Sequence, residues 1–249
     1  MKNSGAVWGA VLGVLLVQGA AAAEIAVLSG GAIEPGLRAA ASAFQKQTGD
    51  TVKITFNTTP QIRKRIEGGE KFDVVIAPPA AMDTFAKAGK VGEERVNVGR
   101  IGMGVAVRSG APVPDISNAE GLRRSLLGAE TLVFNRGSSG LYFEGLLKKM
   151  GVYEQIESKT TRYADAGSVM EHVLKGKGKE IGFGPITEIM MYKEKGLRLV
   201  GPLPAEVQNY TSYAAAVATG SPNGELARSF VRFLEGASSK ALFASAGIE

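Results

Sequence analysis

The segment Ile54–Pro79, ITFNTTPQIRKRIEGGEKFDVVIAPP, constrains the fold more than any other part of the chain. A run of strand-forming residues leads to Thr59, a favourable N-cap, and to Pro60, which suits the first turn of a helix. Gly68-Gly69 ends that helix, and Phe72–Ile76 follows as an apolar strand buried on both faces. The segment therefore predicts a strand, loop, helix and strand of the parallel α/β type.

This corner is a candidate anion site. Thr58-Thr59 lies at the carboxyl end of a strand, which is where ligands bind in open α/β sheets. A helix start also leaves backbone N–H groups without internal acceptors and carries the positive end of the helix dipole. A small anion can therefore be held here without a lysine.

Similar corners recur along the chain. Ser29, Gly30, Gly31 and Ala32 join a short apolar strand to a helix, and Arg136–Gly140 does the same near the middle of the sequence. Ala166–Ser168 and Pro185–Glu188 each open a further helix. The pattern predicts several helix starts that present Ser, Thr or Gly to a shared ligand.

Two long apolar segments rich in small residues, Ile101–Val107 and Tyr213–Ala218, are interpreted as strands that cross between two lobes. The alternative is that both are core strands of a single domain. The first interpretation makes the second lobe an insertion in the first. With a signal peptide at 1–23, this interpretation predicts first-lobe segments at 24–106 and 212–249 and a second lobe at 107–211.

The N-terminal segment Met1–Ala23 has the pattern of a cleavable secretory signal. Lys2 precedes a short apolar stretch, and Ala21–Ala23 forms an A-x-A cleavage site. An uncleaved anchor is the alternative, but the apolar stretch is short for a bilayer. No other segment predicts stable membrane insertion, so we expect a periplasmic protein.

Composition excludes several classes of function. The chain has no cysteine, which removes a lipobox, disulfides, thiol chemistry and Cys-ligated zinc. His172 is the only histidine and lacks a catalytic-triad pattern, and no metal-binding or nucleotide-binding motif is present; Gly176–Lys179 only superficially resembles a phosphate loop. The net charge of +5 suits an anionic ligand, but the basic residues are dispersed, which argues against nucleic acid. No cofactor is expected.

Four charged or polar residues are ambiguous. Arg63 fits a solvated helix face or a ligand contact, and Arg136 could bind a carboxylate in a bidentate manner. Tyr142 could donate to an anion or pack as an ordinary aromatic residue. Glu188 could repel anions, bind a ligand hydroxyl or only complement its own helix dipole.

From Glu24 almost to its end, the chain resembles the molybdate-binding family of bacterial ABC-transporter solute receptors. The blocks that carry the resemblance are FNTTPQIRKRIEGGEKFDVVIAPP, GSSGLYFEGLLKKMGVYE, SVMEHVLKGKGKEIGF and ARSFVRFLEGASSKALFASAG. The resemblance implies a type II, two-lobe Venus-flytrap fold with two crossing hinge strands that closes on its ligand. It also implies an inner-membrane ABC permease as partner and a monomeric receptor.

The resemblance places the family's side-chain donors on Ala32, Thr59 and Pro185, of which only Thr59 keeps a hydroxyl. Its backbone amide donors fall on Ser139 and on Ser168 or Val169. Together with the corners, this gives a predicted ligand site of Ser29, Gly30, Gly31, Ala32, Thr58, Thr59, Arg136, Ser138, Ser139, Tyr142, Ser168, Val169 and Pro185.

Because two side-chain donors are lost, an organic polycarboxylate is favoured over a molybdate-like oxyanion as the captured ligand. The alternative is an enzyme: the family resembles exported aconitate isomerases, which act on a tricarboxylate. Glu188, His172 or Tyr142 could then move the proton, and the sequence selects none of them. A third interpretation is an exported anion-binding protein without a transporter.

Overall fold

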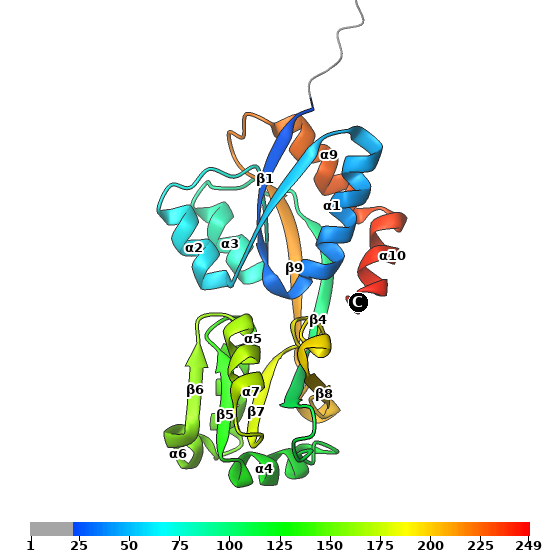
Figure 1. The fold of residues 1–249 in the computed structure, drawn as a ribbon. Coiled ribbons are helices and arrows are strands. Elements are labelled where there is room, and N and C mark those ends of the chain that lie inside the picture. Colours follow the sequence, from blue (N-terminus) through cyan, green and yellow to red (C-terminus); the bar gives the residue numbers. More distant parts are fainter. Residues whose placement is uncertain (1–21) are drawn as a thin grey trace, which may run out of the picture.

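The computed structural model describes residues 22–249, so the predicted signal peptide lies outside the described residues except for its last two. Two α/β lobes lie one above the other, and β4 together with the chain entering β9 connects them (Figure 1). No helix among residues 22–249 is long and apolar enough to span a bilayer.

The first lobe is built on strands in the order β2-β1-β3-β9-β4. Its strands are β1 (Glu24–Gly30), β2 (Thr51–Asn57), β3 (Val74–Ala77), β9 (Tyr210–Val217) and the first half of β4 (Val96–Arg108). Its helices are α1 (Glu34–Thr48), α2 (Thr59–Glu67), α3 (Pro79–Lys87), α9 (Gly224–Glu235) and α10 (Ala237–Ser245). Because β1 is parallel to both β2 and β3, the carboxyl ends of these strands share one edge.

The second lobe continues the sheet as β4-β7-β5-β6, with β8 paired to β4 on a side path. Its own strands are β5 (Thr131–Asn135), β6 (Thr160–Tyr163), β7 (Glu180–Pro185) and β8 (Leu197–Pro202). Its helices are α4 (Ala119–Gly128), α5 (Ser138–Lys149), α6 (Tyr153–Ile156), α7 (Ala166–Lys175) and α8 (Ile186–Met190). Short 3-10 turns are η1 (Gly31–Ile33), η2 (Glu157–Lys159), η3 (Lys193–Lys195) and η4 (Ala205–Val207).

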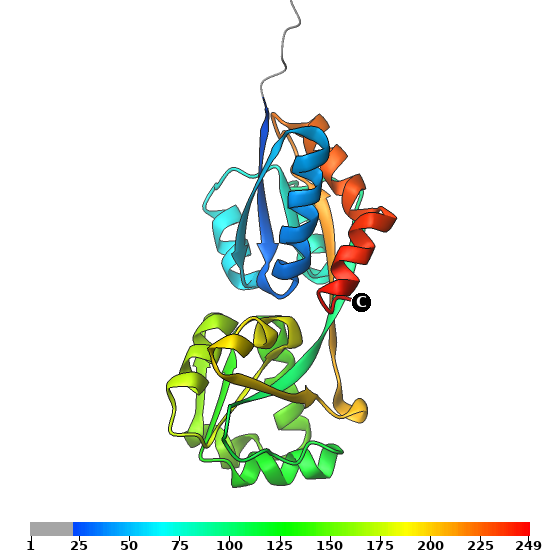
Figure 2. The same cartoon turned by 45° about the vertical axis from the view of Figure 1, so that its right-hand side comes forward.

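Strand β4 belongs to both lobes (Figure 2). It pairs with β9 from Val96 to Gly102 and with β7 and β8 further along. At the crossing, the side chain of Gln208 accepts from the N–H of Met103 at 2.9 Å and donates to its carbonyl at 2.9 Å. This side-chain amide completes the backbone pairing where the chain returns. The boundaries at 106/107 and 211/212 stay predictions.

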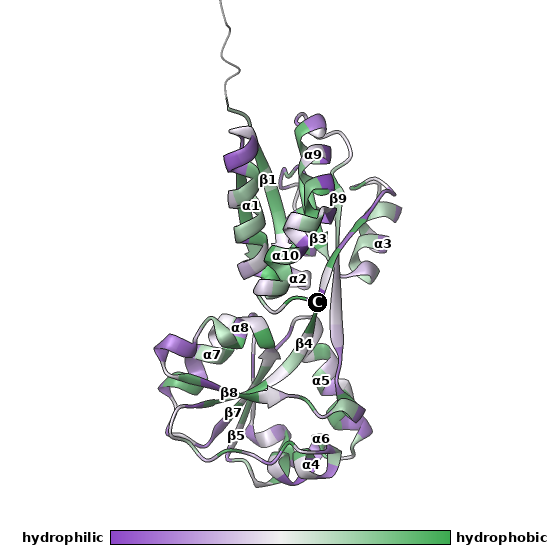
Figure 3. Cartoon of the chain, turned by 90° about the vertical axis from the view of Figure 1, so that its right-hand side faces the viewer, coloured by the Kyte–Doolittle hydropathy of each residue, from purple (hydrophilic) through white to green (hydrophobic). Residues whose placement is uncertain are grey.

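Each lobe has its own apolar core. In the first lobe, Phe44 meets Phe230 edge-on at 5.2 Å between ring centroids. In the second, Phe143 stacks on Phe183 at 4.1 Å. Hydrophobic residues gather along the inner strands and helix faces, while hydrophilic ones lie on outer turns (Figure 3). Separate cores allow the lobes to move relative to each other without exposing either interior.

Two element boundaries differ from expectation. The N-cap of α2 is Thr58 rather than Thr59, because Gln61 forms a capping box with Thr58. Strand β9 begins at Tyr210 rather than Tyr213, since its first residues pair with the middle of β4. The first shift frees the hydroxyl of Thr59 from a capping role.

Candidate functional site

The two lobes meet at a small cavity of about 30 Å³, where strand ends and helix starts of both lobes converge. Its lining is Gly30, Gly31, Ala32, Asn57, Thr58, Thr59, Asn135, Gly137, Ser138, Ser139, Pro185, Glu188 and Tyr213. Such a volume holds about one water molecule. A larger ligand therefore requires the lobes to separate.

The first-lobe side of the cavity is shaped by glycines. A Cβ on Gly30 would lie 2.4 Å from Cε1 of Tyr213, and one on Gly31 would lie 2.7 Å from Oε1 of Glu188. Both distances are too short for any side chain without a shift. The loop therefore lets two ionisable side chains approach the backbone closely.

The α2 corner supplies hydroxyl groups. The N–H of Thr58 donates to Oε1 of Gln61 at 2.8 Å, which fixes the helix start. The neighbouring Thr59 hydroxyl lies 3.1 Å from Oγ of Ser138 in the second lobe. Asn57, just before this corner, has a buried Oδ1 with no partner within residues 22–249. Three polar side chains therefore face a shared space.

The α5 corner supplies backbone donors. Asn135 is 3% exposed, and its Oδ1 accepts from the N–H groups of Gly137 at 2.8 Å and Gly140 at 3.3 Å. Gly137 is the N-cap and offers no side-chain acceptor. The N–H groups of Ser138 and Ser139 find no acceptor in the described chain. They point to an anion-binding helix start.

Glu188 is the acidic residue of the cavity. The preceding residue, Thr187, donates its hydroxyl to the carbonyl of Ala32 in the first lobe at 2.5 Å, which holds α8 against that lobe. Burial, followed by the negative charges of Glu34 and Asp165, raises the pKa of Glu188 from its ordinary value of 4.5 to about 8. Near neutral pH, this carboxyl group is therefore protonated in most molecules.

Tyr213 contributes the second ionisable group, from β9. Its side chain is 6% exposed, and burial together with the charge of Glu188 raises the pKa of its hydroxyl above the ordinary value. The hydroxyl therefore stays protonated and can donate. The cavity lining, all of it within the described residues, contains no lysine or arginine. Charge on a ligand would be balanced by hydrogen-bond donors rather than by cations.

The structure brings most of the predicted site residues together. Those that line the cavity are Gly30, Gly31, Ala32, Thr58, Thr59, Ser138, Ser139 and Pro185. Ser29 is close but fully buried, and its hydroxyl donates to the carbonyl of Gly30 at 3.2 Å. The hydroxyl-bearing corners of both lobes thus meet at one place.

The other predicted residues lie outside this lining. Arg136 is exposed, and the hydroxyl of Tyr142 donates to the carbonyl of Val207 at 2.9 Å. The N–H of Ser168 donates to the carboxylate of Asp165 at 2.8 Å, and Val169 is fully buried in the second-lobe core. None of these four residues lines the cavity.

The structure also separates the candidate bases. Glu188 lines the cavity, whereas Nδ1 of His172 lies 2.9 Å from the hydroxyl of Tyr163 and Tyr142 is engaged by Val207. Arg63 is exposed on α2. Within residues 22–249, no group of three His, Cys, Asp or Glu residues could hold a metal ion. Proton chemistry in the cavity would therefore fall to Glu188.

Sequence reasoning missed four residues of the lining: Asn57, Asn135, Gly137 and Tyr213. The two asparagines end β2 and β5, directly before the glycine- and hydroxyl-rich loops. That position was a usable signal, because polar residues at strand ends commonly face the ligand. Tyr213 gave no such signal, since it reaches the cavity through the pairing of β9 with β3 and β4, which lie far away along the chain.

A larger hollow of about 670 Å³ lies on the first lobe, lined in part by Ala26, Asp73 and Asn223. It opens near the amino ends of the parallel strands, away from the cleft. The carboxylate of Asp73 is occupied by the N–H of Ala26 at 2.8 Å and the hydroxyl of Ser221 at 2.6 Å. Size alone therefore does not make this hollow the functional site.

Comparison with known proteins agrees with this architecture. Over 216 residues the chain is 31% identical to an aconitate isomerase from a Pseudomonas species, which covers 84% of this chain and 81% of that protein. The Azotobacter vinelandii periplasmic molybdate-binding protein superposes with a TM-score of 0.74 at 18% identity, covering 90% of this chain and 98% of that one. The sulfate-binding protein SubI from Mycobacterium tuberculosis gives 0.74 at 17% identity, over 91% and 86%.

These superpositions confirm the predicted α/β fold of periplasmic binding proteins. The family described as bacterial extracellular solute-binding protein matches residues 25–249, which is nearly the whole described chain. The chain therefore belongs to the bacterial extracellular solute-binding protein family.

Proposed function

We propose that this protein captures a small organic polycarboxylate between its lobes in the periplasm and passes it to an inner-membrane ABC permease. The α5 helix start carries the proposal: Ser138 and Ser139 present free N–H groups, and Thr59 faces them from the opposite lobe at 3.1 Å from Ser138. A carboxylate between these groups would be held by both lobes at once. The proposal includes export through the N-terminal signal and a monomeric state.

The chemistry of the lining favours a carboxylate over a tetrahedral oxyanion. A molybdate-like dianion needs donors on all sides, yet Ala32 and Pro185 offer no side-chain donor. An organic acid can place one carboxylate at the α5 start and direct a hydroxyl or second carboxyl group at Glu188 and Tyr213. Oδ1 of Asn57 is a further unpaired acceptor, which suits a ligand hydroxyl.

A thermal-shift screen of the mature protein tests this ligand class. The compounds are citrate, cis-aconitate, trans-aconitate, molybdate, tungstate, sulfate and phosphate. A ligand at 100 times its dissociation constant adds about 2.7 kcal/mol to the free energy of unfolding. We expect stabilisation by a carboxylate. Stabilisation by molybdate or tungstate alone would contradict the proposal.

A second candidate function is isomerisation of a tricarboxylate, which Glu188 specifically favours. As an ionised base, it would remove a proton from a methylene carbon next to the carbon–carbon double bond, and the C–H electron pair would form a new double bond. Returning that proton at the far end of the three-carbon system completes the shift with no net gain or loss of protons or electrons. A carboxyl group with a pKa of about 8 is suited to both steps. The similarity to an aconitate isomerase agrees with this chemistry.

Proton NMR of cis-aconitate incubated with the purified protein tests the second function. Conversion to trans-aconitate should rise about tenfold per pH unit below pH 8 and level off above it, because the base must be ionised. Glu188→Gln should abolish conversion, whereas Glu171→Gln, on the outer face of α7, should not. Tight binding of cis-aconitate without conversion at any pH would leave capture as the function.

A further inference from the structure

A hydrogen bond between the two lobes lies next to an acidic residue, Glu188. Glu188 follows Thr187, whose hydroxyl bond to the carbonyl of Ala32 joins the second lobe to the first at 2.5 Å. Oε1 of Glu188 lies so close to Gly31 of the first lobe that a Cβ there would be 2.7 Å away. When the lobes are together, this carboxyl group is therefore pressed against the opposite lobe and loses water.

The charged groups that face Glu188 are also acids. Glu34 approaches from α1 of the first lobe, and Asp165 from the start of α7. The aromatic hydroxyls of Tyr213 and Tyr192 complete the ionisable surroundings. No cation in the described part of the chain lowers the pKa of Glu188.

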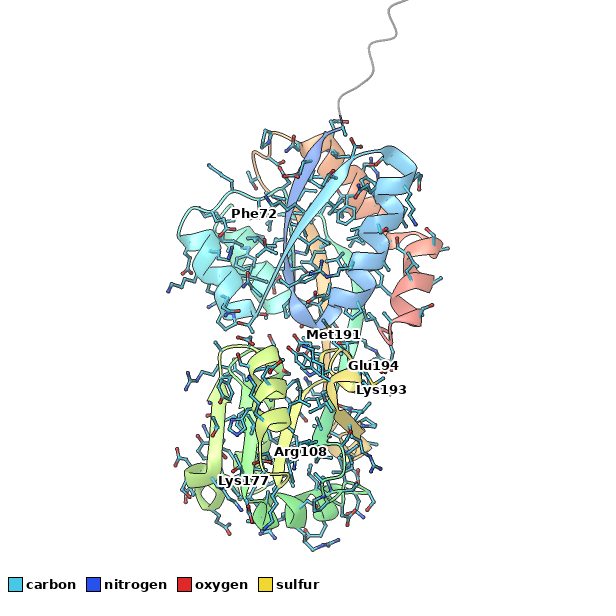
Figure 4. The ribbon with its side chains drawn as sticks, in the orientation of Figure 1. Phe72, Arg108, Lys177, Met191, Lys193 and Glu194 are labelled. Carbon is cyan, nitrogen blue, oxygen red and sulfur yellow. The ribbon has the colours of Figure 1, made fainter. Side chains whose placement is uncertain are left out.

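The two acids that face Glu188 have partners of their own. Nε of Arg38 donates to the carboxylate of Glu34 at 2.7 Å. The carboxylate of Asp165 accepts from the N–H of Ser168 at 2.8 Å. Neither of these bonds brings a cation to Glu188. The segment just after α8, where Figure 4 labels Met191, lies at the level where the lobes meet, whereas the labelled Arg108 and Lys177 lie lower in the second lobe.

Separation of the lobes changes this environment. Glu188 would regain water, and Glu34 would move away with the first lobe, while Asp165 would remain on the same lobe. The carboxyl group therefore binds a proton more tightly in the closed arrangement than in an open one. We propose that closing of the two lobes is coupled to uptake of one proton by Glu188.

The direction of the pH effect follows from this coupling. The pKa of Glu188 is about 8 with the lobes together and approaches the ordinary 4.5 when they separate. Closure is then favoured most at low pH, and its advantage is lost as pH rises toward 8. Between these values the ratio of closed to open molecules should fall by up to about tenfold per pH unit.

Fluorescence energy transfer between the lobes measures closure without a ligand. Because the chain has no cysteine, Lys64→Cys on α2 and Lys149→Cys on α5 place two dyes on exposed positions of opposite lobes. In the otherwise unchanged protein, transfer should fall as pH rises from 5 to 9. In Glu188→Gln, whose side chain is uncharged at every pH, transfer should stay high.

Three further variants make the result decisive. Glu171→Gln removes an acid that pairs with Lys175 at 3.1 Å and should keep the pH dependence. Thr187→Val should lower transfer at every pH yet keep that dependence, since it removes an interlobe bond and no titrating group. Glu34→Gln should move the midpoint to lower pH, which gives a second readout where Glu188→Gln folds poorly.

A flat response of the unchanged protein, or an unaltered pH response in Glu188→Gln, would overturn the coupling. The measurement uses no ligand and no substrate, so it is independent of whether the protein captures a carboxylate or isomerises one. Failure of the thermal-shift screen would leave the coupling intact, and failure of the transfer experiment would leave the proposed function intact.

Discussion

The starts of α5 and α7 look alike in sequence but are occupied differently. At α7, the carboxylate of Asp165 accepts the N–H of Ser168 at 2.8 Å, so the chain caps its own helix. At α5, the equivalent position is Gly137, which has no side chain to accept. Asn135 accepts the N–H of Gly140 instead, so a neutral amide caps the start of α5, whereas the start of α7 already carries a carboxylate. The N–H groups of Ser138 and Ser139 are therefore open to an anionic ligand.

A third place shows the same principle away from the cleft. In the loop Gly176–Lys179, the carboxylate of Glu180 accepts from the N–H groups of Lys177 at 2.7 Å and Gly178 at 2.7 Å. The backbone of this loop therefore binds an anion, which is the carboxylate of Glu180 from the same chain. A group of free backbone donors thus identifies a binding site only where no acidic side chain of the protein fills it.

The largest effect is expected from a variant that places a carboxylate at the N-cap of α5, as at α7. Gly137→Asp places a carboxylate where α7 has one, and we expect it to weaken binding of a carboxylate ligand by at least about 100-fold, or about 2.7 kcal/mol. Calorimetry with the compound found in the thermal-shift screen measures the loss. The introduced carboxylate would compete with the ligand for the N–H groups at the start of α5.

Gly137→Ala is the control for that variant, because it adds a Cβ without a carboxylate. A Cβ at this position would lie 3.2 Å from Oδ1 of Asn135 and 3.3 Å from Cγ2 of Thr58, so it is tight but can be accommodated by small shifts. We expect a loss below about tenfold, of steric origin. Equal affinities of the Asp and Ala variants would show that the α5 donors do not hold the ligand.

Removing the cap of α7 should have a smaller effect, and on stability alone. Asp165→Ala leaves the N–H of Ser168 without its acceptor, which should lower the free energy of unfolding by about 1 kcal/mol in urea denaturation. Asn118→Ala, which uncaps α4 far from the cleft, should cost a similar amount. Ligand affinity at pH 6 should change by less than about twofold in both. A tenfold change in Asp165→Ala would instead place α7 in the site.

Local pattern was enough to predict the elements and the corners. The helix predicted after Ser29–Ala32 is α1, and its residues Leu37, Ala40 and Phe44 are buried in the first-lobe core. Hydroxyl and glycine residues after strands predicted the loops that line the cavity, because both depend on neighbours within a few residues. The fold and most lining residues therefore followed from short-range information.

Long-range contacts set the limit of that prediction. Whether Tyr142 faces a ligand depends on the carbonyl of Val207, 65 positions away along the chain. The role of Glu188 stayed open because its surroundings include Gly31 of the other lobe. Asp165 is different: it stands three residues before Ser168, a local capping pattern that could have been recognised.

An effect of similar or smaller size separates two adjacent threonines at the α2 start. Thr59→Val keeps the shape but removes the hydroxyl 3.1 Å from Oγ of Ser138, so ligand affinity should fall by about 0.5–1.5 kcal/mol while the ligand-free protein melts nearly unchanged. Thr58→Val removes a capping-box residue instead and should lower the melting temperature of the ligand-free protein. Calorimetry and thermal denaturation of both variants give the comparison. If Thr59→Val also lowered the ligand-free melting temperature as much as Thr58→Val does, Thr59 would serve the helix rather than the ligand, and the α2 start would belong with the self-capped start of α7.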